Sequence, residues 1–200
     1  MIEELDTSKY EEDIQAIEKK VANLGHIPDL VAFYGSSSIR LWETLKSDMS
    51  PLEVINLGFG GSSYPYCHMY FYRIFKNLKP SKIVLYAGDN DLGTGHEPTR
   101  ILRNFNLLLN DIVRKFRNAN IYTISIKPSP RREGLMPKTV ATNDLIKKAT
   151  LDVSGHWIDV YSQMLSPEGK PRPELYVEDM LHLNEKGYEI WKRVVREHLL

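Results

Sequence analysis

The chain has 200 residues, of which 42% are hydrophobic and 10% aromatic, a composition typical of one globular domain with a sizeable core. Its 26 basic and 26 acidic residues cancel, so no overall field attracts nucleic acid or an anionic membrane, and neither is expected as a partner. A single cysteine, Cys67, excludes an intramolecular disulfide and a cysteine-based zinc cluster, and we expect no metal and no cofactor.

The N-terminus lacks the basic start and apolar centre of a signal peptide, and no apolar run is long enough to span a bilayer. We therefore expect a cytoplasmic protein. The composition leaves homo-oligomerisation open.

The first thirty residues predict an amphipathic helix. Ser8-Lys9-Tyr10-Glu11 has the form of a capping box, and apolar residues then recur at helical spacing up to Gly25. Pro28 separates this helix from the first strand. Residues 1–29 are therefore expected to form a helical segment packed on a single domain that spans residues 1–200.

Five short apolar runs predict β-strands. They span residues 30–34, 53–57, 82–87, 120–126 and 156–160. The helical stretches between and after them are a segment with Leu41 and Leu45, residues 66–77, a long helix that opens at Pro98, residues 139–151, and a last helix that Asn184 can cap. This alternation predicts an α/β fold, a three-layer α/β/α sandwich around a parallel sheet. Five strands favour the flavodoxin-like order 2-1-3-4-5.

Polar or glycine-rich segments follow the strands, and the carboxyl ends of parallel strands meet at one edge of a sheet. After the first three strands come Gly35-Ser36-Ser37-Ser38-Ile39, Gly58-Phe59-Gly60-Gly61 and Gly88-Asp89-Asn90-Asp91. The long loop after the fifth strand carries Asp179 and His182. The fold thus gathers a hydroxyl, a glycine backbone, a carboxamide and an acid–imidazole pair, which is the set that nucleophilic acyl transfer needs.

Each of these groups has a chemical reason to be there. A serine hydroxyl needs a base, and the imidazole of His182 can accept its proton near neutral pH. Asp179 lies three residues earlier, a spacing that puts both side chains on one face of a helical turn or tight loop. An oxyanion can be met by the backbone N–H of Gly61, the side-chain N–H of Asn90 and the helix-start N–H of Ser37.

Taken alone, each segment also has an ordinary structural explanation. Serines are common turn and N-cap residues, three close glycines often form a plain turn, and Asn90 is a frequent turn former. Asp179 and His182 alone are more often a surface ion pair, and Arg131 and Arg132 are expected to be solvated. The glycines lack the lysine of a phosphate loop and the spacing of a dinucleotide site. Four signals in order at four strand ends outweigh these alternatives.

The four segments resemble the conserved blocks of the SGNH, or GDSL-type, hydrolases, in that family's order and across residues 35–182. The family's fold is the three-layer sandwich, and its members are esterases, lipases and carbohydrate deacetylases. The first block, with the pattern GSSSIRxW, is most similar to a bacterial branch. The resemblance implies a catalytic triad and an oxyanion hole: Ser37 as nucleophile, His182 as base, Asp179 as its partner, and Ser37, Gly61 and Asn90 as oxyanion donors.

Two positions depart from the family pattern. Ser36 stands where the family usually has an aspartate, which removes a charge beside the nucleophile. Tyr64-Pro65-Tyr66 stands where an acidic residue often follows the glycines, so a more aromatic pocket wall is expected.

These observations predict a serine hydrolase that cleaves carboxylic esters. Short loops leave no obvious lid, which favours a short acyl group, such as acetyl on a carbohydrate or on another small-molecule ester. An acyltransferase that uses the same residues is the alternative, and a non-catalytic flavodoxin-like binding module is a third reading.

Overall fold

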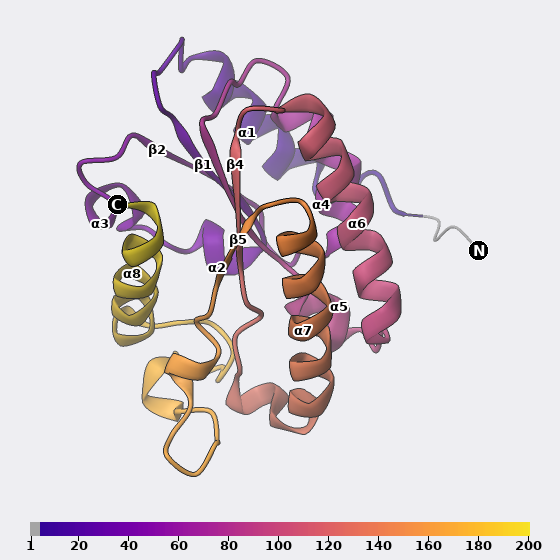
Figure 1. Cartoon of the computed structure of the whole chain (residues 1–200), viewed down its shortest axis with the longest axis vertical. Coiled ribbons are helices and arrows are strands. Elements are labelled where there is room, and N and C mark those ends of the chain that lie inside the picture. The colour runs from indigo at the N-terminus through magenta and orange to yellow at the C-terminus, as the bar shows by residue number, and fades with distance from the viewer. Residues whose placement is uncertain (1–4) are drawn as a thin grey trace.

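Five parallel strands form the centre of the molecule in a computed structural model that describes residues 5–200. They are β1 (Val31–Gly35), β2 (Val54–Gly58), β3 (Lys82–Tyr86), β4 (Asn120–Ile124) and β5 (His156–Ile158). Their order in the sheet is β2-β1-β3-β4-β5, and every neighbouring pair is parallel (Figure 1). The predicted α/β class and strand order are therefore confirmed.

The composition of the central strands follows from their position. All residues of β1 are buried, and in β3 only Lys82 is partly exposed. A strand covered by helices on both faces cannot alternate polar and apolar residues, so both strands are continuous apolar runs. The edge strand β2 differs, since Val54 and Asn56 are only half-buried.

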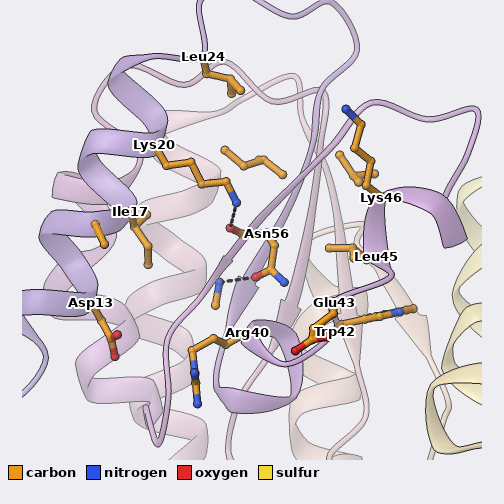
Figure 2. Close-up of a pocket in the computed structure, with 14 residues that line it drawn as sticks. Asp13, Ile17, Lys20, Leu24, Arg40, Trp42, Glu43, Leu45, Lys46 and Asn56 are labelled. Atoms are coloured by element: carbon orange, nitrogen blue, oxygen red, sulfur yellow. Dashed lines mark hydrogen bonds between the residues drawn. The ribbon is translucent and has the colours of Figure 1, made fainter. Parts of the chain in front are cut away.

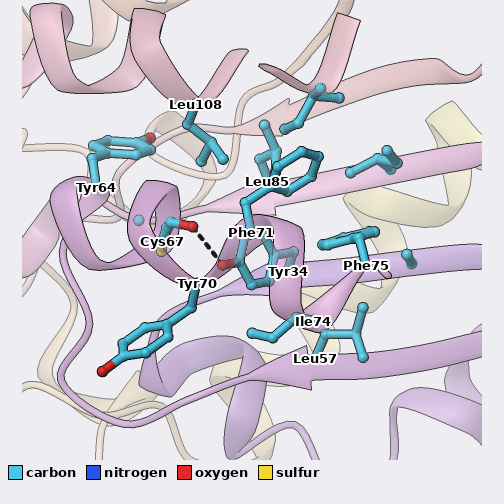
Figure 3. Packing of buried hydrophobic residues seen from close by; sticks show 14 of the residues in the cluster. Tyr34, Leu57, Tyr64, Cys67, Tyr70, Phe71, Ile74, Phe75, Leu85 and Leu108 are labelled. Carbon is cyan, nitrogen blue, oxygen red and sulfur yellow. Dashed lines mark hydrogen bonds between the residues drawn. The ribbon is translucent and has the colours of Figure 1, made fainter. Parts of the chain in front are cut away.

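Four helices cover one face of the sheet: α1 (Glu11–Ala22), α4 (Tyr64–Ile74), α6 (Pro98–Lys115) and α7 (Met136–Asp152). The larger of two buried cores lies between these helices and the strands. Figure 3 shows its part beneath α4, where Phe71 and Phe75 lie near Tyr34 of β1. The Tyr34 and Phe75 ring centroids are 5.1 Å apart, and the Tyr34 hydroxyl donates to the backbone carbonyl of Cys67 at 2.6 Å. The buried hydroxyl thus ties α4 to the sheet.

Three helices cover the opposite face: α2 (Ser37–Arg40), α3 (Leu45–Asp48) and α8 (Glu185–Leu199). The second core lies here and contains Trp42 and Trp191, whose ring centroids are 5.8 Å apart. Trp42 also stacks on Tyr188 at 5.5 Å. The chain after the first serine-rich turn and the final helix therefore share one core.

The predicted N-terminal cap is confirmed for the last helix, α8, but not for the first helix, α1. α8 is capped as expected, since the Asn184 side chain accepts the Gly187 N–H at 3.2 Å. The prediction of a capping box at Ser8 is wrong. α1 begins at Glu11 without a side-chain cap, because the Ser8 hydroxyl bonds the nearby carboxylate of Asp6 at 2.6 Å.

Several short elements were not expected. The predicted helical segment around Leu41 and Leu45 is divided into α2 and α3, because Trp42 turns into the core and its indole N–H donates to Asp48 at 2.8 Å. A helix, α5 (Asp89–Gly93), follows β3 directly. Residues 5–200 also contain three short 3-10 helices: η1 (Pro130–Leu135), η2 (Ser162–Met164) and η3 (Pro173–Leu175). Within residues 5–200, no helix has the length and apolar character to cross a membrane.

Candidate active site

The turn after β1 presents Ser37 at the rim of the sheet, as the first residue of α2. Gly35 makes this turn possible, because its φ is 147° and an added Cβ would lie 1.7 Å from the carbonyl oxygen of Tyr86. The next N–H, that of Ser36, donates to the same oxygen at 2.9 Å. Ser36 occupies the N-cap position of α2 but makes no side-chain cap bond. The first strand and its neighbour β3 therefore hold Ser37 in place through the backbone.

Ser37, His182 and Asp179 form one hydrogen-bonded row. The Ser37 Oγ lies 3.1 Å from His182 Nε2, although 145 residues separate them in sequence. The other ring nitrogen, Nδ1, lies 2.5 Å from Asp179 Oδ2. An ionised carboxylate only accepts hydrogen bonds, so Nδ1 carries the proton in this contact and Nε2 is left to accept from the serine hydroxyl. The structure therefore brings these three predicted residues together.

Asp179 and His182 lie in a tight loop rather than on a helix. The Asp179 Oδ1 atom accepts the backbone N–H of Leu181 at 2.8 Å and that of His182 at 2.9 Å. Met180 between them has a left-handed backbone, with φ of 57°. Partial burial would raise the pKa of Asp179, but the N–H groups of His182 and Leu181 outweigh it and lower the pKa to about 2. The carboxylate is therefore ionised throughout the neutral range.

Hydrogen bonds connect the loops after β2 and β3 to each other and to β1. Ser62 Oγ donates to the carbonyl of Gly35 at 3.2 Å, and the Ser62 carbonyl accepts Asn90 Nδ2 at 3.0 Å. Gly61 precedes Ser62 with a left-handed φ of 71°, and its carbonyl accepts the Tyr10 hydroxyl at 2.9 Å. The structure thus joins the turn that contains Gly61 to the side chain of Asn90. The Ser37 N–H, at the first position of α2, has no intrahelical acceptor.

A buried ionic cluster lies behind Asn90. The carboxylate of Asp89 accepts Lys127 Nζ at 3.0 Å and also pairs with the Arg132 guanidinium. Arg132 Nη2 donates to the Asn90 Oδ1 atom at 3.3 Å. The expectation that Arg132 is solvated is wrong, since only 19% of its side chain is exposed, whereas Arg131 is exposed. Sequence reasoning missed Arg132 and Lys127 as site residues. The sequence signal that could have identified them is their position after β4, at the carboxyl edge of the sheet where Ser37 also lies.

Tyr64, His68 and Arg40 make contacts outside this row. Tyr64 is 1% exposed and packs against Phe105, so it is a core residue and not part of a pocket wall. His68 lies 3.1 Å from Asp111 on the α4–α6 side. The Arg40 guanidinium lies against Gly60, where an added Cβ would be 3.0 Å from its Nε atom.

A separate cavity of about 580 Å³ lies at the open edge of β2 (Figure 2). The Asn56 side chain makes two hydrogen bonds at this edge. Its Oδ1 atom accepts the Gly58 N–H at 3.0 Å, and its Nδ2 atom donates to the Ile39 carbonyl at 2.5 Å. Lys20 of α1 donates to the Asn56 carbonyl at 3.0 Å. Two of these bonds, to the Gly58 N–H and to the Asn56 carbonyl, occupy backbone groups that an edge strand otherwise offers to another chain.

Comparison of the sequence with models of protein families gives a match over most of the chain. The model of the GDSL-like lipase/acylhydrolase family matches residues 29–190, a range that includes every residue of the row and of the cluster behind Asn90. A search of curated proteins gave no significant match.

Solved structures with the same architecture include proteins of two Bacteroides species. A proposed acylhydrolase from Bacteroides fragilis NCTC 9343 is 19% identical, with a TM-score of 0.80 over 98% of each chain. A GDSL-like lipase from Bacteroides thetaiotaomicron VPI-5482 is 18% identical, with a TM-score of 0.78 over 93% of this chain and 96% of that one. An acetyl xylan esterase is 20% identical, with a TM-score of 0.72 over 86% of this chain and 100% of the other. These likenesses establish the fold.

Proposed function

The chain belongs to the GDSL-like lipase/acylhydrolase family, and from that premise we propose that it is a serine esterase that cleaves carboxylic esters through an acyl-enzyme on Ser37. The observation that supports this most is the row from Ser37 Oγ through His182 to Asp179, with contacts of 3.1 and 2.5 Å. A serine becomes a useful nucleophile when a base accepts its proton and a third group orients that base.

In the first step, Ser37 Oγ attacks the ester carbonyl carbon while His182 Nε2 takes the hydroxyl proton. Asp179 holds the Nδ1–H and stabilises the imidazolium that forms. The tautomer is suited to this step, because the carboxylate keeps the proton on Nδ1 and leaves Nε2 unprotonated.

The tetrahedral intermediate carries a negative charge on the former carbonyl oxygen. Its donors are the N–H groups of Ser37 and Gly61 and the second N–H of Asn90, whose first N–H is already bonded to Ser62. The intermediate then collapses, and the alcohol leaves with the proton from His182. Water, activated by the same imidazole, hydrolyses the acyl-enzyme and releases the acid.

We further propose a short acyl group, such as acetyl, on a carbohydrate or another small ester. The segments after β1, β2 and β3 lead into α2, the 59–63 turn and α5 without an insertion long enough to form a lid. The similar fold of an acetyl xylan esterase is compatible with this substrate class. The GSSSIRxW block supports placement in a bacterial branch of the family.

The mechanism is tested with the three adjacent serines as one matched series. On p-nitrophenyl acetate, Ser37→Ala is expected to lose activity by about ten-thousand-fold or more, because it removes the nucleophile. Ser36→Ala and Ser38→Ala are expected to keep most of the activity, and a fluorophosphonate probe is expected to label all proteins except Ser37→Ala. A folded Ser37→Ala variant with the wild-type rate would remove Ser37 from this role.

The acyl-group proposal is tested with p-nitrophenyl esters of increasing chain length and with acetylated sugars. We expect kcat/KM to be highest for acetyl and to fall as the chain lengthens. Rapid hydrolysis of long-chain esters without activity on acetyl esters would contradict the proposed substrate class and leave the mechanism standing.

A further inference from the structure

The oxygen and the nitrogen of the Asn90 carboxamide each bond a group that fixes the orientation of the carboxamide. Its Nδ2 atom donates to the Ser62 carbonyl at 3.0 Å, and its Oδ1 atom accepts from Arg132 Nη2 at 3.3 Å. A carbonyl can only accept a hydrogen bond, and a guanidinium can only donate. A flipped carboxamide would put oxygen against oxygen and N–H against N–H, and would lose both bonds.

Arg132 is itself fixed on three sides. Its Nη1 atom donates to the backbone carbonyl of Asp89 at 2.7 Å and also to the Asp89 carboxylate. Gly93 lies against the guanidinium so closely that an added Cβ would be 2.5 Å from Nη2. The helix α5 therefore provides the carboxylate that holds Arg132, the glycine on which it packs, and the Asn90 side chain that it contacts.

The cluster behind Asn90 consists of one carboxylate and two cationic side chains. Asp89 contributes one negative charge, while Arg132 and Lys127, whose side chain is 1% exposed, contribute two positive charges. Burial would raise the pKa of Asp89, but the charges of Lys127 and Arg132 outweigh it and lower the pKa. The carboxylate is ionised, and Lys127 and Arg132 both pair with it.

From these contacts we propose that Arg132 is a positioning residue that locks the Asn90 carboxamide in the orientation that presents N–H to the oxyanion and strengthens that N–H as a donor. The inference rests on the proposed esterase function, in which Asn90 meets the oxyanion. A cation bonded to the carboxamide oxygen polarises the group, so the opposite N–H binds negative charge better. The benefit is largest when the oxyanion is present, and Arg132 therefore acts on kcat more than on KM.

The test is a double-mutant cycle between Arg132 and Asn90, measured on p-nitrophenyl acetate. Arg132→Met is expected to lower kcat about 10- to 100-fold, less than the loss of a direct donor, while KM changes less than about twofold. In an Asn90→Ala background the same substitution is expected to cost less than about threefold, since its partner is gone. Arg131→Met, at the exposed neighbouring arginine, is the matched control and is expected to keep wild-type kcat.

Three outcomes would overturn the proposal: an unchanged kcat in folded Arg132→Met, a rise in KM at constant kcat, or an equal loss with and without Asn90. Folding is expected to survive, because Lys127 still pairs with Asp89 in Arg132→Met. If that variant does not fold, Arg132→Lys carries the same cycle. A single ammonium cannot serve both Asp89 and Asn90 with the geometry of a guanidinium, so an intermediate loss of kcat is expected.

Failure of the proposed function is distinguished by a readout that needs no catalysis. The side-chain amide NMR signals of Asn90 are expected to shift in Arg132→Met and to stay unchanged in Arg131→Met. Wild-type protein without esterase activity would contradict the proposed function, and this shift would still support the positioning. Unchanged Asn90 signals in folded Arg132→Met would overturn the positioning even in an active esterase.

Discussion

Asp179 has two structural tasks, one for each of its carboxylate oxygens. Oδ1 accepts two backbone N–H groups, from Leu181 and His182, and so builds the tight loop. Oδ2 contacts His182 Nδ1 and so sets the orientation of the ring. A substitution that keeps the first task and alters the second separates folding from catalysis.

Asp179→Asn is such a substitution. Its carbonyl oxygen can still accept the loop N–H groups, whereas its amide N–H would face Nδ1 and favour the tautomer with the proton on Nε2. We expect kcat to fall about a thousand- to ten-thousand-fold with little change in the melting temperature. Glu178→Gln, at an exposed neighbour, is the control and is expected to keep its activity. Activity within tenfold of wild type in Asp179→Asn would contradict the assigned role.

At the scale of elements, α1 is fastened to α4 by an ionic network as well as by apolar packing. Arg73 of α4 contacts Glu11 at 2.8 Å and Glu18 at 2.8 Å, both on α1. The hydrogen bond from Arg73 is the main reason that the pKa of Glu11 is lowered to about 2 from 4.5. All three side chains are more than a third exposed, so solvent screens their contribution to stability.

The sign of the pH dependence follows from the lowered pKa of Glu11. Its contribution is fully present above the unfolded pKa of 4.5 and is lost as the pH falls from there toward about 2. Arg73→Met is therefore expected to have a lower urea midpoint than wild type at neutral pH, with the difference closing in acid. Arg103→Met, at an exposed arginine of α6, is expected to show no such pH-dependent difference. A difference for Arg73→Met that stays constant down to about pH 2 would contradict this account.

At the scale of the whole molecule, the second core joins two halves of the site that are far apart in sequence. Ser37 opens α2, and His182 lies just before α8. The Tyr188 hydroxyl of α8 donates to the Ser38 carbonyl of α2 at 3.0 Å. Below this bond, Trp42 packs against both Tyr188 and Trp191. The distance between nucleophile and base is therefore set by how α8 packs on the segment around α2.

The fold and the four rim segments could be predicted because buried parallel strands are continuous apolar runs and their ends fall at one edge of the sheet. Contacts between segments that are distant in sequence could not be predicted in this way. The sequence predicts Arg132 in solvent, yet it pairs with Asp89, 43 residues away. The local sequence pattern around Arg132 contains no information about such a distant partner. Trp42 is a similar case, since its turn into the core interrupts a stretch that reads as a single helix. In both cases a tertiary contact overrides a local pattern.

The packing of α8 gives the last prediction. Trp191 is fully buried, contacts the Tyr86 ring at 4.8 Å, and has an indole N–H without a hydrogen-bond partner among residues 5–200. Its role is therefore packing, and Trp191→Ala is expected to lower the free energy of unfolding by about 3–5 kcal/mol, measured in urea. Because α8 then packs less tightly, His182 is expected to be held less well against Ser37, and kcat is expected to fall.

Trp157→Ala is the matched control for this prediction, since it removes the same side chain at a half-buried position on the edge strand β5. There the lost apolar burial is smaller and neither side of the site rests on the residue, so a smaller loss of stability and a retained kcat are expected. Equal effects of the two substitutions on both quantities would show that the second core does not couple α8 to the serine helix.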